Sequence, residues 1–314
     1  MTCIITGGAG HLAGHLAQAL THRFERIVLM DVAPQPRAPM PANADYCSMD
    51  ICDQPRVEEL FQKYRPTAVI HLASLLFGNS EQDRRKAWRV NTTATMEILE
   101  QAQAFRDCRV IFASSIATYG GKLPARLSED QPQWPVSLYG VTKVACERLG
   151  AYFREAHGVD FRCVRIPIVI SPYASKGSVS AAMSNAFVES SRNGRFVFGF
   201  RPETRIAGMY VNDVTRAFVH LLEASREKIS QPVYNLSGFN ASMSEISAAI
   251  RQRLPKVEHG FKPDAKMDSV LSCWPGEIDD ANARRDWGWS PAFDLETATE
   301  DFLSVIQKEN IQVL

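Results

Sequence analysis

Residues 3–14 read Cys-Ile-Ile-Thr-Gly-Gly-Ala-Gly-His-Leu-Ala-Gly, and this stretch decides the fold. Its first three residues form a short apolar run with two β-branched side chains, which predicts a fully buried strand. Glycines follow at positions 7, 8 and 10, and an apolar, helix-forming run then extends from Leu12 to Leu20. A strand, a glycine turn and a helix in this order predict a parallel α/β sheet with a dinucleotide site at its first turn.

Each part of the glycine turn has a physical role in such a site. Gly7 allows the tight turn, and Gly10 removes a side chain where the pyrophosphate must approach the backbone. The backbone amides at the start of the helix, at His11 and Leu12, then face the anion. Ala13 stands where a third glycine is common, and it is still small enough for the helix to pack closely on the strand.

A second predicted strand, residues 26–30, ends at Asp31. An acid at the tip of this strand, about 20 residues after the glycines, accepts hydrogen bonds from the ribose hydroxyls of NAD and repels the 2′-phosphate of NADP. A strand-end cap is the alternative role, and the nearby Arg37 leaves NADP open. Asp50 and Ile51 close a short extended piece and are expected to bracket the adenine.

Further apolar runs predict the rest of the sheet and its helices. The expected strands are 67–73, 109–113, 161–170 and 233–236, and the expected helices are 56–64, 88–105, 213–223 and 244–254. Leu72 and Ala73 fall at the C-terminal end of a strand, where open α/β sheets bind ligands. His71 is interpreted as a satisfied core residue. Asn91 is expected either to bridge backbone segments by hydrogen bonds or to lie at the surface.

The stretch 137–143, Ser-Leu-Tyr-Gly-Val-Thr-Lys, carries the candidate chemistry. Tyr139 and Lys143 are four residues apart, which places both side chains on one face of a helix. The cation is expected to favour the phenolate and so to lower the tyrosine pKa, giving an acid/base group for an alcohol or a carbonyl. Ser115 or its neighbour Ser114, after the strand 109–113, can donate a hydrogen bond to the same substrate oxygen. We favour Ser115 of these two alternatives.

Composition excludes several classes of function. The chain has 314 residues, 45% hydrophobic and 22% charged, which is ordinary for a soluble protein with an ample core. Lys plus Arg equals Asp plus Glu at 35 each, so no basic excess indicates nucleic acid and no charge block indicates a membrane surface. Seven cysteines without metal-ligand spacing, and an N-terminus that predicts a strand and no signal peptide, lead us to expect no metal and a cytoplasmic location.

Taken together, the glycine turn, the serine pair 114–115 and Tyr139-x-x-x-Lys143 resemble an extended short-chain dehydrogenase/reductase over essentially the full chain. The resemblance implies a Rossmann-type doubly wound parallel sheet with a smaller C-terminal substrate-binding domain. It implies that Tyr139 is the acid/base, that Lys143 lowers its pKa and binds the nicotinamide ribose, and that Ser115 polarises the substrate oxygen. The turn near Pro167, with Ile166, is expected to contact the nicotinamide.

These arguments give an expected set of site residues and domains. The catalytic residues are Ser115, Tyr139 and Lys143. The residues expected to bind NAD are Gly7, Gly10, His11, Leu12, Asp31, Asp50, Ile51, Leu72, Ala73, Asn91, Tyr139, Lys143 and Ile166. The residues expected to bind substrate are Ser74, Ser115, Tyr139, Ser180 and Trp274. Residues 1–170 are expected to form the NAD-binding domain, to which 209–238 return, and 171–314 mainly the substrate domain.

Several segments narrow the resemblance to the SDR-type L-threonine 3-dehydrogenases. They are residues 71–76, His-Leu-Ala-Ser-Leu-Leu; 272–280, Ser-Cys-Trp-Pro-Gly-Glu-Ile-Asp-Asp; and 286–289, Asp-Trp-Gly-Trp. The resemblance implies oxidation of the β-hydroxyl of L-threonine to 2-amino-3-oxobutanoate, with Trp274 closing over a small substrate. Ser74 is then available for the substrate carboxylate.

The loop at residues 176–182 departs from that family. The family carries a glycine-rich loop and Thr-Thr-Asp-Tyr-Ala, whereas this chain reads Lys-Gly-Ser-Val-Ser-Ala-Ala. Ser180 retains one hydroxyl and the acid is absent. Phe77 also stands where a small residue is common. The altered loop leaves open another 2-amino-3-hydroxy acid, a different small polar molecule, or an altered way of holding threonine.

Two other classes of function remain. A sugar-nucleotide epimerase or dehydratase shares the glycine turn and the Tyr-Lys pair, and Arg192, Arg195, Arg201 and Arg205 would serve its diphosphate. An NAD-sensing binding module is the non-enzymatic alternative. Extended members of the superfamily often form homodimers through two helices, here those containing Met96 and Tyr152, and a monomer is not excluded.

Overall fold

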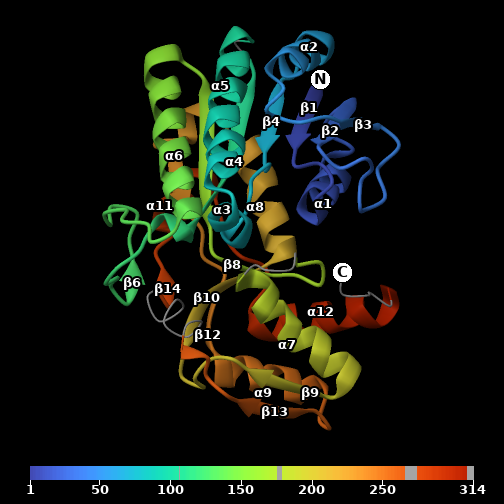
Figure 1. The fold of residues 1–314 in the computed structure, drawn as a ribbon, viewed down its shortest axis with the longest axis vertical. Coiled ribbons are helices and arrows are strands. Elements are labelled where there is room, and N and C mark those ends of the chain that lie inside the picture. The colour runs from blue at the N-terminus through green and yellow to red at the C-terminus, as the bar shows by residue number, and fades with distance from the viewer. Residues whose placement is uncertain (106, 175–178, 266–273, 310–314) are drawn as a thin grey trace.

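A seven-stranded parallel sheet forms the centre of the larger part of the molecule. The computed structural model describes residues 1–105, 107–174, 179–265 and 274–309 (Figure 1). The strand order is β11-β7-β5-β4-β1-β2-β3, and every neighbouring pair is parallel. The strands are β1 (Thr2–Thr6), β2 (Arg26–Asp31), β3 (Ala44–Ser48), β4 (Ala68–His71), β5 (Arg109–Ser115), β7 (Asp160–Ile166) and β11 (Val233–Asn235).

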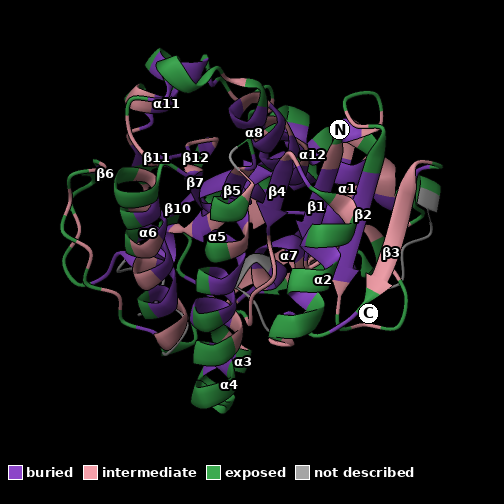
Figure 2. Ribbon diagram, turned by 90° about the horizontal axis from the view of Figure 1, so that it is seen from above, coloured by how far each residue is buried: buried purple, intermediate pink, exposed green. Residues whose placement is uncertain are grey.

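Helices cover both faces of this sheet, which is why its central strands are apolar on both sides. One face packs on α2 (Gln54–Tyr64), α5 (Ala94–Ala104) and α6 (Leu138–His157). The other packs on α1 (His11–Leu20) and α8 (Val211–Glu223). Figure 2, seen from above, shows the buried strands between these two layers. The expected doubly wound Rossmann-type α/β fold is confirmed.

The single helix expected at 88–105 is divided into three pieces. After α3 (Phe77–Gln82), the chain forms α4 (Arg84–Trp88), a π-helical turn at Arg89–Thr93 and then α5. The π-turn leaves the backbone oxygen of Asn91 free to accept from Thr95 Oγ1 at 2.5 Å and from Cys146 Sγ at 3.0 Å. Such turns concentrate near functional sites, and this one lies beside α6.

The single strand expected at 161–170 is also broken. β7 ends at Ile166, and β8 (Ile168–Ile170) pairs instead with β10 (Arg205–Tyr210) in a second sheet of order β12-β10-β8. Pro167 stands between them, and a proline cannot donate to a strand ladder. The chain therefore passes from one sheet to the other at this residue.

The smaller part lies beneath the large sheet in Figure 1 and has its own hydrophobic core. Phe187, Phe198 and Phe302 are among its fully buried side chains. Its elements are α7 (Val179–Asn193), β9 (Arg195–Phe198), β10, β12 (Phe239–Ser242), α9 (Met243–Arg253), β13 (Glu258–Phe261) and α12 (Leu295–Glu309). Ser242 caps the N-terminus of α9 in a capping box with Glu245.

Short elements complete the chain. They are the 3-10 turns Ile116–Thr118 and Arg226–Lys228, the paired strands β6 (Arg126–Leu127) and β14 (Glu277–Ile278), and α11 (Ala281–Trp287). Trp287 and Trp289 pack in the core of the larger part, although they lie near the C-terminus. The division into domains at residue 170 stays a prediction.

The described residues hold neither a membrane-spanning helix nor a metal-binding cluster of side chains. Among the described residues, no helix has the length and apolar character needed to span a membrane. The same residues contain no group of three or more His, Cys, Asp or Glu side chains arranged to hold a metal ion.

Candidate active site

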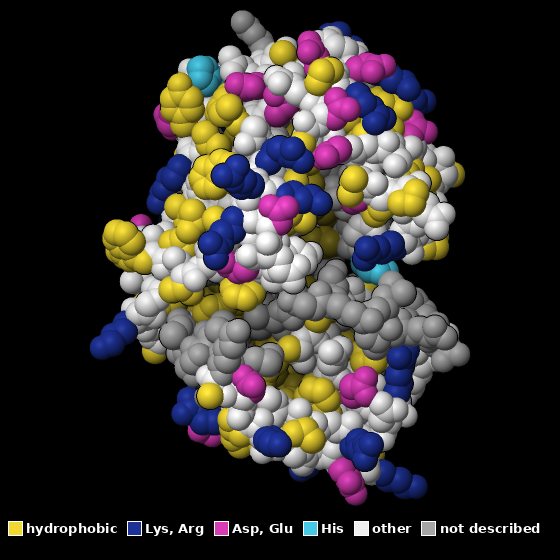
Figure 3. Space-filling model, in the orientation of Figure 1, with side chains coloured by type: hydrophobic (Ala, Val, Ile, Leu, Met, Phe, Trp, Pro, Cys, Tyr) yellow, Lys and Arg dark blue, Asp and Glu magenta, His cyan; other side chains and the backbone are white. Residues whose placement is uncertain are grey.

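A cleft of about 580 Å³ opens at the C-terminal ends of the central strands, between the larger and smaller parts. In Figure 3 acidic and basic side chains are interspersed over the face shown, without a large patch of one sign. Most of the expected site residues line this cleft: Gly7, Gly10, His11, Leu12, Asp31, Asp50, Ile51, Leu72, Ala73, Ser74, Ser115, Tyr139, Lys143, Ile166 and Trp274. Residues far apart in sequence therefore meet at one site.

The glycine turn forms a cradle that side chains would fill. Gly7 has φ +71°, and a Cβ there would come within 3.0 Å of the Ala73 nitrogen. A Cβ at Gly8 would come within 2.7 Å of the Met30 nitrogen. Gly10 is the N-cap of α1 and has no side chain to cap the helix itself. The first amides of α1 can thus bind an anion, and the cradle fits the pyrophosphate of a dinucleotide.

Asp31 lies at the tip of β2 beside this cradle. Its Oδ2 accepts from the backbone nitrogen of Ala9 at 3.0 Å, and its Oδ1 accepts from that of Ala33 at 2.9 Å. A carboxylate offers about four acceptor positions, so oxygen lone pairs remain for ribose hydroxyls. Arg37 lines the same end of the cleft. Asp50 holds its own turn by accepting from the Cys52 nitrogen at 2.9 Å.

Buried polar groups fix the turn after β4. The Thr6 hydroxyl accepts from the nitrogens of Leu72 and Ala73, both at 3.1 Å, and lies 2.6 Å from His71 Nδ1. His71 Nε2 lies 2.9 Å from Thr95 Oγ1. Burial lowers the pKa of His71 to about 3, and the nearby Lys143 charge acts in the same direction. The neutral imidazole therefore holds the Thr6 hydroxyl, which in turn fixes the backbone of Leu72 and Ala73 at the cofactor end of the cleft.

Asn91 lies behind the cleft and is absent from its lining. Its Oδ1 accepts from the Leu75 nitrogen at 2.7 Å, and its Nδ2 donates to the Leu75 oxygen at 3.1 Å and to Thr142 Oγ1 at 3.0 Å. It thus bridges backbone and helix by hydrogen bonds. Its contact with the cofactor stays a prediction.

The two serines after β5 point in different directions. Ser114 is buried, and its hydroxyl donates to Glu147 Oε1 at 2.5 Å. Ser115 lines the cleft, accepts from the Ala117 nitrogen at 3.2 Å and forms a side-chain hydrogen bond with Tyr139. Successive residues of a strand face opposite sides, and although Ser114 also borders the cleft, its hydroxyl is directed to Glu147. The geometry favours Ser115.

Tyr139 and Lys143 lie in the first two turns of α6, whose N-cap is Ser137. Lys143 Nζ donates to the Ala113 oxygen at 2.7 Å and lies 5.5 Å from the centroid of the Tyr139 ring. Burial lowers the pKa of Lys143 to about 8. Tyr139, Lys143 and Ser115 thus share one wall of the cleft.

One expectation about this pair is wrong. We expected Lys143 to lower the pKa of Tyr139. Burial instead raises the pKa of Tyr139 to about 12, with the hydrogen bond from Ser115 acting in the opposite direction. The ammonium is itself buried and directs a hydrogen bond to a backbone oxygen. The phenol is therefore neutral at ordinary pH.

The substrate end of the cleft is only partly accounted for by the expected residues. Ser74 lines it and donates weakly to the Leu75 oxygen at 3.4 Å, and Trp274 lines it as a half-buried side chain. Ser180 is the second residue of α7, but its side chain lies outside the described residues, as do residues 175–178 and 266–273.

Sequence reasoning missed Tyr173 and Lys86, which also line the cleft. The Tyr173 ring stacks on His11 with centroids 4.6 Å apart and planes at 14°. Tyr173 lies three residues after the end of β8, and an aromatic residue shortly after a strand that reaches the cleft was the available signal. Lys86 is in α4 and carried no signal in the sequence.

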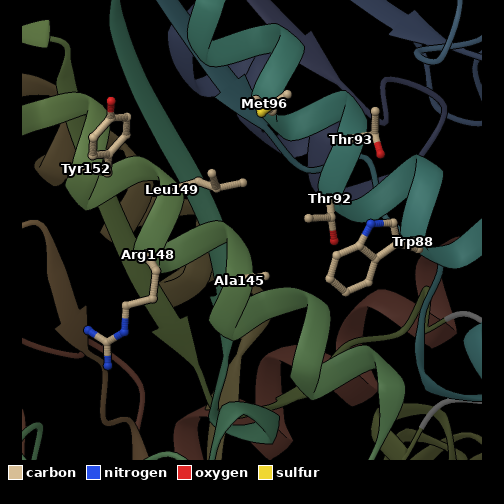
Figure 4. Close-up of a pocket in the computed structure, with 8 residues that line it drawn as sticks. All are labelled: Trp88, Thr92, Thr93, Met96, Ala145, Arg148, Leu149 and Tyr152. Atoms are coloured by element: carbon tan, nitrogen blue, oxygen red, sulfur yellow. The ribbon is translucent and has the colours of Figure 1, made fainter. Parts of the chain in front are cut away.

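A second, shallower groove of about 510 Å³ lies away from the cleft, between α4–α5 and α6. Trp88, Met96 and Tyr152 line it and are each more than a third exposed. Figure 4 shows side chains of the two helical segments facing one another across it, with Arg148 at one side. This is the face through which a homodimer was expected.

The chain is similar to known proteins over most of its length. The NAD dependent epimerase/dehydratase family matches residues 3–237. The mitochondrial L-threonine 3-dehydrogenase of Bos taurus is 32% identical over 296 residues, covering 93% of this chain and 79% of that protein. The X-ray structure of L-threonine dehydrogenase from Clostridium difficile superposes with a TM-score of 0.93 at 28% identity and 99% coverage of both chains.

A more distant structure shares the fold alone. The UDP-glucose 4-epimerase of Thermotoga maritima superposes with a TM-score of 0.88 at 21% identity, covering 99% of this chain and 100% of that one. The glycine cradle, Asp31 and the wall formed by Ser115, Tyr139 and Lys143 fit NAD, the cofactor in the family's name. The chain therefore belongs to the NAD dependent epimerase/dehydratase family, as an NAD-dependent dehydrogenase.

Proposed function

We propose that this enzyme oxidises the β-hydroxyl of L-threonine to 2-amino-3-oxobutanoate. The observation that carries the proposal is the placement of Ser115, Tyr139 and Lys143 on one wall of a cleft whose other end is a dinucleotide cradle. The similarity to L-threonine 3-dehydrogenases supports the choice of substrate.

Each protein residue has a distinct role in this proposal. The glycine cradle and Asp31 would hold NAD, which would supply the hydride acceptor for the β-carbon and a positive ring that favours the phenolate of Tyr139. The Tyr139 oxygen takes the hydroxyl proton as the carbonyl forms, so one proton and one hydride leave the alcohol. Ser115 donates a hydrogen bond to the same oxygen and fixes its position. Lys143 places a cation beside the phenol and, in our proposal, binds the nicotinamide ribose.

NADH absorbance with a substrate panel tests the proposal. The panel contains L-threonine, D-threonine, L-serine, 3-hydroxynorvaline, simple hydroxy acids and polyols. We expect a selective signal on L-threonine, and a Tyr139→Phe variant should lose about 10²- to 10⁴-fold in kcat while still binding NAD. Tyr152→Phe, in the groove, is the matched control and should keep its activity. No NADH from L-threonine or any related β-hydroxy amino acid would overturn the proposal.

The sugar-nucleotide epimerase or dehydratase remains the alternative. Of its candidate diphosphate ligands, Arg201 pairs with Glu203 and Arg205 with Glu245, and none of the four arginines at 192, 195, 201 and 205 is among the described residues that line the cleft. Turnover of a UDP-sugar without net formation of NADH, by protein that retains NAD through purification, would favour this alternative. The binding module would be favoured if Tyr139→Phe left the protein's function unchanged.

Two further properties stay proposals. The homodimer through α5 and α6 is supported by the exposed apolar side chains of the groove, and light scattering on wild type and Tyr152→Glu separates it from the monomer. A cytoplasmic location is supported by the six described cysteines, which are all unpaired, as expected in a reducing compartment. Fractionation of the source cells tests it.

A further inference from the structure

A buried ion pair lies directly behind the wall of the cleft that is formed by Ser115, Tyr139 and Lys143, here called the catalytic wall. Arg165, on β7, donates to both oxygens of Glu147, on α6, at 3.0 Å from Nε and 2.8 Å from Nη2. The side chain of Glu147 is 0% exposed and that of Arg165 is 5% exposed. Removing two charges from water costs about as much as their attraction returns, so stability alone gives little reason for such a pair. Its contacts indicate another role.

The pair holds the end of β5. Ser114 donates to Glu147 at 2.5 Å, and it is also the register partner of Arg165 in the neighbouring strand. Because successive strand residues face opposite sides, a fixed Ser114 turns the next residue, Ser115, toward the cleft. On α6, Glu147 is four residues after Lys143 and thus one turn along the same face.

The same pair anchors the segment that leads into α6. Gln133 Nε2 donates to Glu147 Oε2 at 2.8 Å, and Arg165 Nη1 contacts the Tyr119 hydroxyl and lies 3.4 Å from Asn235 Oδ1. The segment from Tyr119 to Gln133 connects β5 to the N-terminus of α6, where Tyr139 lies. One ion pair therefore touches every chain segment that carries a catalytic side chain.

We propose that Glu147 and Arg165 form a positioning unit that holds Ser115, Tyr139 and the Lys143 ammonium in their reacting arrangement. This inference rests on the proposed roles of those three residues. Neither Glu147 nor Arg165 lines the cleft, so both act through other groups.

The charges around Lys143 support this role. Burial lowers the pKa of Lys143 to about 8, while Cys146, Cys163 and Glu147 act to raise it. The other described titratable groups facing it are Tyr139, on its own helix, and the neutral His71, on β4. For Arg165, burial alone would lower the pKa, but the hydrogen bonds and charge of Glu147 raise it above its usual value. Replacing the Glu147 charge should thus weaken the protonated form of Lys143.

The chain offers a matched control on the same strand. Arg162 is also buried on β7 and pairs with Asp160 through two hydrogen bonds of 2.8 and 2.9 Å. It faces the opposite side of the sheet and donates to the Leu221 and Ala224 oxygens at the end of α8. It touches no residue of the catalytic wall. A purely structural role predicts equal behaviour of the two pairs.

The experiment compares Glu147→Gln with Asp160→Asn in the full chain. Protein labelled with ¹³C at lysine Cε reports the Lys143 titration by NMR, with Lys143→Arg assigning the signal. We expect Glu147→Gln to lower the Lys143 midpoint by about one pH unit and Asp160→Asn to leave it unchanged. With substrate, kcat should fall about tenfold with little change in KM, and the high-pH limb of the rate profile should move to lower pH.

A double variant keeps the test valid if the single change unfolds the protein. Glu147→Gln with Arg165→Met leaves no unpaired buried charge and should restore the unfolding midpoint without restoring kcat. An unchanged Lys143 titration, rate profile and kcat in a folded Glu147 variant, or losses matched by Asp160→Asn, would overturn the inference. If the wild-type protein is inactive on threonine, only the proposed substrate is contradicted. The positioning role can still be tested, because the NMR titration of Lys143 needs no substrate.

Discussion

The two ends of the cleft are built in different ways. At the cofactor end, backbone amides and short side chains follow directly from the ends of β1, β2 and β4, and Thr6, Asp31 and His71 hold them by hydrogen bonds. At the substrate end, the lining includes Trp274 from the last quarter of the chain and residues that follow β8. The first end is fixed by the ladder of one sheet. The second depends on how the smaller part packs on the larger.

The largest expected effect tests how firmly the cofactor end is fixed. His71 has a folded-state pKa of about 3, below its ordinary value of 6.5. Between pH 6.5 and pH 3, the His71 imidazole is protonated in the unfolded chain but stays neutral in the folded chain. The free energy of unfolding therefore falls as the pH drops through this range, by up to roughly 5 kcal/mol. Denaturant unfolding across this range measures the slope. His71→Gln should lose this part of the slope, and the exposed His22→Gln should keep it. Equal slopes in both variants would contradict the buried neutral role.

A second test asks whether Asp31 acts on the cofactor alone. Asp31→Ala removes the acceptor for the Ala9 amide and for the ribose hydroxyls, and hydrogen bonds to a charged group contribute about 1.5–3 kcal/mol. We expect NAD to bind at least about tenfold more weakly by calorimetry. The control is Asp45→Ala, because Asp45 is a partly exposed residue of β3 that pairs with Arg26 of β2. Equal NAD affinity in the two variants would assign Asp31 to capping the strand end.

A third test addresses the substrate end. Trp274→Ala removes a large apolar surface from the cleft. The KM for the alcohol substrate should therefore rise about tenfold, while the dissociation constant of NAD stays near that of wild type. Trp134→Ala, at a highly exposed position, serves as the control. A parallel loss of NAD affinity in Trp274→Ala would show that the two ends are not independent.

The smallest expected effect lies where the two ends meet. Tyr173 stacks on His11 at the start of α1, and such ring pairs contribute about 0.5–1.5 kcal/mol. Tyr173→Leu should weaken NAD binding by that amount in calorimetry. Tyr64→Leu, at the end of α2, is the control. No measurable change for Tyr173 would leave the ring pair as packing between the two parts only.

The difference between the two ends also explains what sequence reasoning found. Gly7, Gly10 and Asp31 were predicted from their local spacing in the sequence, and in the structure all three line the cleft. Tyr139 and Lys143 are one helical turn apart, so their common face was also readable. Such geometry needs only the periodicity of strands and helices.

Other features depend on contacts between distant segments. The Ser114 hydroxyl is directed to Glu147, which is 33 residues away in sequence, and this contact is what favours Ser115 as the serine that faces the cleft. The raised pKa of Tyr139 follows from burial, which no spacing reveals. The break at Pro167 was visible as a residue, but its consequence was not, because β8 finds its partner in β10. Sequence periodicity carries none of these.

The break at Pro167 also bears on how such an enzyme changes over evolutionary time. β7 pairs within the large sheet and β8 within the small one, so substitutions in the smaller sheet leave the ladder beneath the cofactor untouched. Selection can therefore remodel the wall that receives the substrate while the redox half keeps its hydrogen bonds. A single proline between two strands allows one oxidoreductase scaffold to acquire new specificities without being rebuilt.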